Sequence, residues 1–202
     1  MLIAPEMKDV LKAARFLEGR IRKTPVEKSY PLSDMAGSEV FLKWENQQLC
    51  GSFKVRGALN KMYSLTSLER GRGVITASSG NHAQGVAMAA SLLGVRAVIC
   101  VPGSCPETKR EAILSRGSGL VDLRVIGRFY DEAEAEAKAV AERDGLVYVS
   151  AYEDHHIVSG QGTLGLEFLM EVPDLDLLIV PISGGGLISG VATAARALRP
   201  GI

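Results

Sequence analysis

The chain has 202 residues, of which 47% are hydrophobic, 5% are aromatic and 22 are glycine. Lysines plus arginines number 23, as do aspartates plus glutamates, so the formal net charge is zero and offers no attraction for nucleic acid or an acidic membrane surface. These values favour an aliphatic globular protein of the α/β class with a small-molecule partner.

The pattern of cysteines and histidines gives no sign of metal binding. Cys50, Cys100 and Cys105 are odd in number and lack metal-ligand spacing, so we expect free thiols, no metal site and a reducing, cytoplasmic setting. Residues 1–6 lack a basic region followed by an apolar core, so no signal peptide is expected. The longest apolar runs are far shorter than the roughly 20 residues that span a bilayer.

The first part of the chain is predicted to be mostly helical. Residues 7–18 have apolar side chains three and four positions apart, which predicts an amphipathic helix that ends at Gly19. Thr24 and Pro25 then turn the chain, because proline disfavours helix in the residue before it. The next expected elements are a short helical turn, a strand and a helix, over 29–34, 39–44 and 55–65.

A repeated strand–loop–helix pattern follows. Short connections between apolar strands and helical runs are typical of βαβ units and a parallel sheet. The expected strands are 73–77, 95–101, 120–126 and 146–150. The expected helices are 83–93, 107–114 and 130–143. The sequence therefore predicts a three-layer α/β/α small domain with a parallel sheet over residues 68–150.

The last part of the chain is predicted to contain a helix over 159–170, a strand over 175–182 and a helix over 187–198. One strand with its crossover cannot form a sheet alone. It needs the N-terminal strands, further chain or another subunit as a partner. We therefore expect residues 1–67 and 151–202 to form part of an incomplete, larger α/β domain.

Three successive glycines, Gly184, Gly185 and Gly186, lie between the last predicted strand and helix. Free backbone N–H groups and the helix dipole form an anion site at such a junction. A dinucleotide-binding fingerprint is excluded because Ser189 occupies the position of its third glycine. A P-loop is excluded because no Gly-Lys-Ser/Thr follows. A packing turn is the alternative, but three glycines favour a close approach to the backbone and predict a phosphate site.

A second loop, at another strand-to-helix junction, has the sequence Ser78, Ser79, Gly80, Asn81, His82. Its hydroxyls, amide and N–H groups suit a carboxylate or another anion. Helix capping by Ser79 or Asn81 is the more common role for such residues. His82 has no acidic neighbour in the sequence, so we give it little weight as a catalytic base.

Lys54 is the candidate nucleophile. Lysine forms Schiff bases with carbonyl cofactors, and burial makes it more nucleophilic by lowering its pKa. Most lysines are solvated at the surface. Here, Phe53 and the preceding Gly51-Ser52 turn could hold an aromatic cofactor close to the amine. Arg56 is equally consistent with a structural ion pair and with ligand binding.

Together these stretches resemble the fold-type II pyridoxal-phosphate enzymes, in particular the branch of threonine/serine dehydratases and serine racemases. Residues 51–58 resemble the cofactor-lysine motif, 78–85 the substrate-carboxylate loop and 183–187 the phosphate loop, and 159–163 is also similar. The order of the motifs matches that of the family. The resemblance implies a tryptophan synthase β-like fold, in which residues 1–67 and 151–202 belong to the large cofactor-binding domain.

The sequence departs from the family pattern in three places. Cys50 stands where threonine is usual, and Ser183 stands where a fourth glycine is usual. Both residues are small, so we expect the fold to be unchanged. Family members also continue well past residue 202, so the chain is expected to be an N-terminal fragment that lacks part of the site.

The resemblance also implies a role for each motif. Lys54 would bind pyridoxal 5'-phosphate as a Schiff base and remove the α-proton of the substrate, with Ser79 as the second proton carrier. Phe53 would lie against the cofactor ring and Asn81 would contact its 3-hydroxyl. The residues implied to bind the phosphate are Ser183, Gly184, Gly185, Gly186 and Leu187. Those implied to bind the substrate carboxylate are Ser78, Ser79, Gly80, Asn81 and His82.

The implied activity is that of a pyridoxal-phosphate-dependent dehydratase, or ammonia-lyase, which converts threonine or serine to a 2-oxo acid and ammonia. The alternatives are a β-replacement enzyme of the same fold and a non-catalytic fragment that binds the cofactor or an amino acid. The serines that open the 78–82 loop favour dehydration, since replacement enzymes more often have threonine there. The expected partner is a small hydroxyamino acid, with no nucleic acid or membrane. The full-length form is expected to be a homo-oligomer, a dimer or tetramer.

Overall fold

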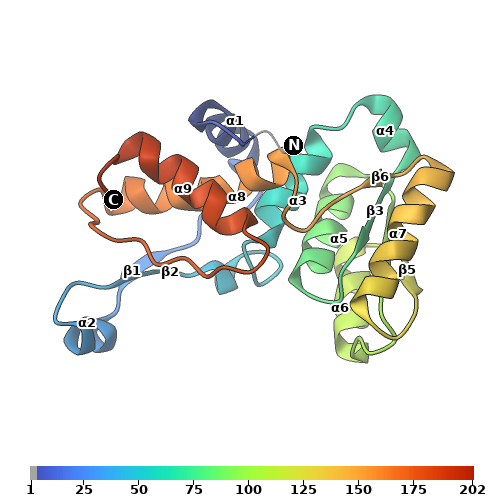
Figure 1. Cartoon of the computed structure of the whole chain (residues 1–202), viewed down its shortest axis with the longest axis horizontal. Helices are drawn as coiled ribbons and strands as arrows, with labels where there is room; N and C mark the ends of the chain where they lie inside the picture. The colour runs from blue at the N-terminus through green and yellow to red at the C-terminus, as the bar shows by residue number, and fades with distance from the viewer. Residues whose placement is uncertain (1–3) are drawn as a thin grey trace.

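The computed structural model describes residues 4–202, so the first three residues of the segment analysed for a signal peptide lie outside the described part. Figure 1 shows a parallel sheet with its helices on one side of the molecule and helices from both ends of the chain on the other. The division into a small domain over 68–150 and a larger domain from 1–67 and 151–202 stays a prediction.

The parallel sheet has the strand order β5-β4-β3-β6. Its strands are β3 (Val74–Ala77), β4 (Ala97–Val101), β5 (Val121–Val125) and β6 (Val147–Tyr148). Val74 of β3 pairs with Ala97 on one side and with Val147 on the other. All four residues of β3 are buried, as expected for a central strand covered on both faces. The four strands predicted for this part are confirmed, and each is shorter than predicted.

Helices cover both faces of the sheet, which gives three layers. One buried cluster includes Val86, Ile99 and Ile113, and a second includes Ile75 and Ala137. The first joins the sheet to α3, α5 and α6, whereas the second joins it to α7. The helices of this part are α3 (Lys54–Tyr63), α4 (Ser67–Arg72), α5 (Asn81–Leu93), α6 (Glu107–Gly117) and α7 (Tyr130–Asp144). The predicted α/β fold with a parallel sheet is confirmed.

The other part of the molecule is built on α8, which packs against α9 and α3. A Cβ atom on Gly160 would lie 2.6 Å from the Arg56 carbonyl oxygen, and one on Gly190 would lie 2.6 Å from the Gly162 nitrogen. These contacts require glycine, so the helices approach closely. The elements here are α1 (Met7–Leu17), β1 (Val26–Lys28), α2 (Tyr30–Ala36), β2 (Phe41–Lys43), η1 (Glu45–Gln47), α8 (His155–Glu171) and α9 (Gly186–Leu198).

The strand predicted over 175–182 is wrong, because this segment contains no regular secondary structure. The side chains of Leu177, Ile179 and Ile182 are 72%, 88% and 73% exposed. A strand requires a neighbour for its N–H and C=O groups. Among residues 4–202, β1 and β2 pair only with each other, and the four-stranded sheet does not reach this segment.

The described residues include no helix that is long and apolar enough to cross a membrane. Cys50, Cys100 and Cys105 are buried free thiols. Within residues 4–202, no group of three or more histidine, cysteine, aspartate or glutamate side chains is arranged to hold a metal ion.

Candidate active site

Lys54 is the first residue of α3, and its side chain points inward rather than into solvent. Gly51, with φ of 73°, provides the turn before the helix. The Lys54 Nζ atom donates a hydrogen bond to the Ala151 carbonyl oxygen at 2.8 Å and lies 5.3 Å from the centre of the Phe53 ring. Burial lowers the pKa of Lys54. The amine therefore loses its proton more readily than a surface lysine does, which favours nucleophilic chemistry.

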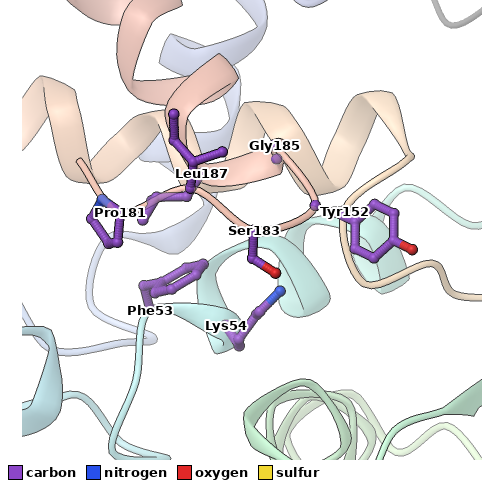
Figure 2. Close-up of a pocket in the computed structure, with 10 residues that line it drawn as sticks. Phe53, Lys54, Tyr152, Pro181, Ser183, Gly185 and Leu187 are labelled. Atoms are coloured by element: carbon purple, nitrogen blue, oxygen red, sulfur yellow. The ribbon is translucent and has the colours of Figure 1, made fainter. Parts of the chain in front are cut away.

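A cavity of about 270 Å³ lies next to this amine. Figure 2 shows the Lys54 and Ser183 side chains pointing toward each other, with Phe53 and Tyr152 on either side. The remaining lining residues come from the segment that leads into α9. The full set is Phe53, Lys54, Tyr152, Pro181, Ile182, Ser183, Gly184, Gly185, Gly186 and Leu187. The predicted cofactor residues therefore lie together at this cavity, with the exception of Asn81.

The glycine loop provides backbone donors at the end of the cavity. Gly185 has a φ of 85° and precedes α9, which begins at Gly186. The first N–H groups of a helix have no acceptor within the helix, and the helix dipole makes this end positive. The segment 183–187 therefore presents free donors and a partial positive charge to an anion.

Tyr152, Pro181 and Ile182 line the cavity although the sequence did not predict them as site residues, and Tyr152 makes the closest contacts with the glycine loop. A Cβ atom on Gly184 would lie 2.3 Å from its ring, and one on Gly186 would lie 3.0 Å from its Cα atom. Two of the three glycines are thus required by packing against Tyr152, and Gly185 by its backbone angle. Tyr152 lies in the connection between β6 and α8, where no sequence motif marks it.

Residues 78–82 follow β3 and include the first two residues of α5, and they lie outside the cavity lining. Gly80 is the N-cap of α5, and no side chain caps the helix, so the capping roles considered for Ser79 and Asn81 are not observed. Ser78 Oγ accepts a hydrogen bond from the Gly80 N–H at 3.2 Å. Ser79 is partly buried and Asn81 is exposed. The substrate-carboxylate role of this loop stays a prediction.

His82 differs from the rest of its loop because it is buried. Its Nε2 atom lies 3.1 Å from the Val149 carbonyl oxygen. Burial, followed by the positive charge of Lys54, lowers the pKa of His82 to about 4. The imidazole is therefore neutral at pH 7.

Arg56 forms a structural ion cluster. Its guanidinium group is fully buried and contacts both carboxylate oxygens of Glu45 at 2.8 Å and those of Glu167 at 2.6 and 2.9 Å. Lys43 Nζ lies 2.8 Å from Glu167. Of the two roles that the sequence left open, the structural ion pair is therefore the one observed. The cluster fixes the first turn of α3, two residues beyond Lys54.

A buried amine opposite a helix N-terminus, on an α/β fold, is the arrangement of a protein that binds a phosphorylated carbonyl compound. The family model described as "Pyridoxal-phosphate dependent enzyme" matches residues 17–202. The chain therefore belongs to the pyridoxal-phosphate-dependent enzyme family, and pyridoxal 5'-phosphate is its cofactor.

Two relatives carry names of the dehydratase branch. The chain is 42% identical to L-threonine ammonia-lyase of Thermotoga maritima, over 96% of this chain and 48% of the relative. It is 39% identical to the L-threonine dehydratase catabolic TdcB of Escherichia coli K12, over 96% of this chain and 58% of the relative. The chain thus spans about half the length of the curated relatives it matches.

Solved structures agree with the fold. Maize serine racemase matches with a TM-score of 0.94 and 39% identity, over 99% of this chain and 60% of the racemase. Threonine deaminase isoform 2 of Solanum lycopersicum matches with a TM-score of 0.88 and 36% identity, over 100% of this chain and 57% of the deaminase. The fold-type II architecture expected from the resemblance is confirmed.

Proposed function

We propose that this chain provides the cofactor lysine and phosphate loop of an ammonia-lyase that converts threonine or serine to a 2-oxo acid and ammonia. The single observation that carries the proposal is the Lys54 amine, which is partly buried beside a cavity lined by residues 183–187. The reaction class is supported by the names of the relatives, an L-threonine ammonia-lyase and an L-threonine dehydratase.

The cavity residues fit the chemical groups of pyridoxal phosphate. The aldehyde needs a primary amine, which Lys54 provides. The phosphate needs N–H donors, which the backbone of 183–187 provides at the start of α9. The flat ring needs apolar walls, and Phe53 and Tyr152 line the same cavity. When bound, the cofactor withdraws electrons from the α-carbon of the amino acid.

We assign the proton transfer to Lys54 Nζ. An amine with a lowered pKa is neutral in a larger fraction of molecules, so it can take the α-proton of the substrate. The Ala151 carbonyl orients the amine by accepting its hydrogen bond. Loss of the α-proton, and of the β-hydroxyl as water, gives an enamine, whose imine tautomer is hydrolysed to the 2-oxo acid and ammonia. Residues 78–82 are proposed to bind the carboxylate, and Ser79 to carry a proton on the opposite face.

The activity is tested by incubating the protein with pyridoxal phosphate and threonine or serine and measuring 2-oxo acid and ammonia in equal amounts. Ser79→Ala, which removes the proposed second proton carrier, and Lys54→Ala are compared with the wild type. Equal amounts of both products support the dehydratase. A new β-substituted amino acid from serine and an added nucleophile would instead identify a replacement enzyme.

A second candidate is a non-catalytic module that binds the cofactor or an amino acid. Cofactor absorbance without ammonia release from either amino acid would support it.

We also propose a cytoplasmic location and a homo-oligomeric full-length form, a dimer or tetramer. Light scattering of the full-length protein tests the oligomeric state. We further propose that residues 68–150 form a small domain next to an incomplete large domain made of 1–67 and 151–202. Limited proteolysis tests this boundary.

A further inference from the structure

A buried polar cluster outside the cavity lining connects the parallel sheet to Lys54. Its centre is Val149, which directly follows β6 and whose N–H donates to the Ile75 carbonyl oxygen at 2.8 Å. The Val149 carbonyl oxygen accepts two hydrogen bonds, from Thr76 Oγ1 at 2.8 Å and from His82 Nε2 at 3.1 Å. Two residues further on, the Ala151 carbonyl holds the Lys54 amine at 2.8 Å. The same short segment is therefore fixed by His82 and contacts Lys54.

The contact with Val149 defines the tautomer of His82. A carbonyl oxygen only accepts hydrogen bonds, so the proton of the neutral ring lies on Nε2 and the lone pair on Nδ1. His82 is only 3% exposed. Among the described residues, its Nδ1 atom has no hydrogen-bond partner. A buried polar atom without a partner is costly and calls for an explanation.

The positive charge on Lys54 disfavours a second proton on the His82 ring, in agreement with an unprotonated Nδ1. The helix that carries His82 also packs closely on the start of α3, because a Cβ atom on Gly85 of α5 would lie only 3.0 Å from the Lys54 carbonyl carbon. The imidazole is therefore held next to the first turn of α3.

We propose that His82 is a positioning residue for Lys54: its Nε2–H group fixes the Val149 carbonyl and thereby the 149–151 segment, whose Ala151 carbonyl orients the amine. This role of the imidazole is separate from the carboxylate binding that is proposed for residues 78–82. The inference rests on the proposed function, because it gives His82 a part in preparing the amine that the proposed reaction uses.

The first test measures the pH dependence of reductive methylation at Lys54 in the protein without cofactor. Peptide mass spectrometry follows the labelling, normalised to Lys12, whose side chain is 76% exposed. His82→Leu removes the donor to Val149, and His82→Gln retains an N–H group at the end of the side chain. Asn60→Ala is the matched control, since it removes a hydrogen bond of 2.7 Å from α3 to the His156 carbonyl oxygen.

We expect the titration midpoint of Lys54 in the wild type to lie below the ordinary lysine value of about 10.4. His82→Leu should lower it further, with about a tenfold change in the neutral fraction, because freeing the 149–151 segment removes the Ala151 oxygen that stabilises the ammonium form. His82→Gln and Asn60→Ala should retain the wild-type midpoint. An unchanged midpoint in His82→Leu, or an equal shift in Asn60→Ala, would overturn the proposal.

The second test needs no variant and stands even if His82→Leu fails to fold. Nitrogen-15 NMR of the imidazole in the wild type should show a neutral ring protonated at Nε2 from about pH 5.5 to 8. A proton on Nδ1, or titration near the ordinary histidine value, would contradict the proposal. Both tests use the protein without cofactor, so a failure of pyridoxal phosphate to attach at Lys54 would refute the proposed function alone.

Discussion

Two loops of this molecule have the same kind of sequence, an apolar run followed by small residues and a helix, but they differ in structure. The loop 78–82 follows β3, which is hydrogen-bonded on both sides. The loop 183–187 follows the unpaired segment 175–182 and yet lines the cavity at Lys54. The first loop is thus supported by the sheet, whereas the second is supported by packing against Tyr152 and by the start of α9. The comparison of the two loops therefore distinguishes the sheet residues that stabilise the fold from the residues of the second loop that form the cavity.

The largest loss of stability should come from shortening a buried side chain in the hydrogen-bonded parallel sheet. Ile99 of β4 is fully buried, whereas Ile179 of the unpaired segment is 88% exposed. Ile99→Ala should lower the free energy of unfolding by about 2–5 kcal/mol through lost burial and a cavity. Ile179→Ala should change it by less than about 0.5 kcal/mol. Denaturant unfolding measures both, and equal losses would mean that the 175–182 segment is packed in solution.

A side chain added to the second loop should have the next largest effect. Gly184→Ala places a Cβ atom 2.3 Å from the Tyr152 ring, whereas the same change at Gly80 meets no atom within 4 Å. Gly184→Ala should destabilise the protein by about 1–3 kcal/mol and weaken pyridoxal phosphate binding about tenfold or more. Gly80→Ala is the matched control in the first loop. A Gly184→Ala variant with wild-type cofactor affinity would contradict the role of the second loop.

The smallest expected effect is the pH dependence of stability that comes from the partly buried Lys54 amine beside the second loop. Because burial lowers the pKa of Lys54 in the folded state, the unfolded chain binds more protons, and stability rises with pH from the folded pKa up to the unfolded value of about 10.4. Lys54→Met should remove this slope. Thermal unfolding of both proteins between neutral and alkaline pH should show the difference between them shrinking as the pH rises. Parallel curves would mean that the amine is solvated.

Elements that depend on the local sequence pattern were predicted correctly from the sequence. Elements that depend on contacts between residues far apart in the chain were not. The four sheet strands and the long helices follow from apolar periodicity and short connections. Residues 175–182 have the same apolar pattern as the sheet strands. A strand also needs a neighbouring strand to pair with, and the sequence of the segment itself does not show whether one is present. Helix α4 was overlooked although Thr66 and Glu69 form a capping box that its sequence contains.

The residues of the candidate site also fall into those that the local sequence predicts and those that depend on distant contacts. Phe53, Lys54 and the glycine loop were predicted from residue type and position, and they line one cavity. Tyr152 and the contact of His82 with Val149 depend on how the β6–α8 connection folds back across α3 and α5. Packing against Tyr152 requires two of the loop glycines, Gly184 and Gly186, whereas the sequence favoured the approach of a ligand over the alternative of a packing turn.

The central claim is that Lys54 is the residue that binds the cofactor covalently. Its most direct test is to incubate the protein with pyridoxal phosphate, reduce with borohydride, dialyse and identify the labelled peptide by mass spectrometry. We predict one cofactor label, on Lys54, and loss of the bound absorbance band in Lys54→Ala. A label on another lysine, or a band that persists in Lys54→Ala after reduction and dialysis, would contradict the claim.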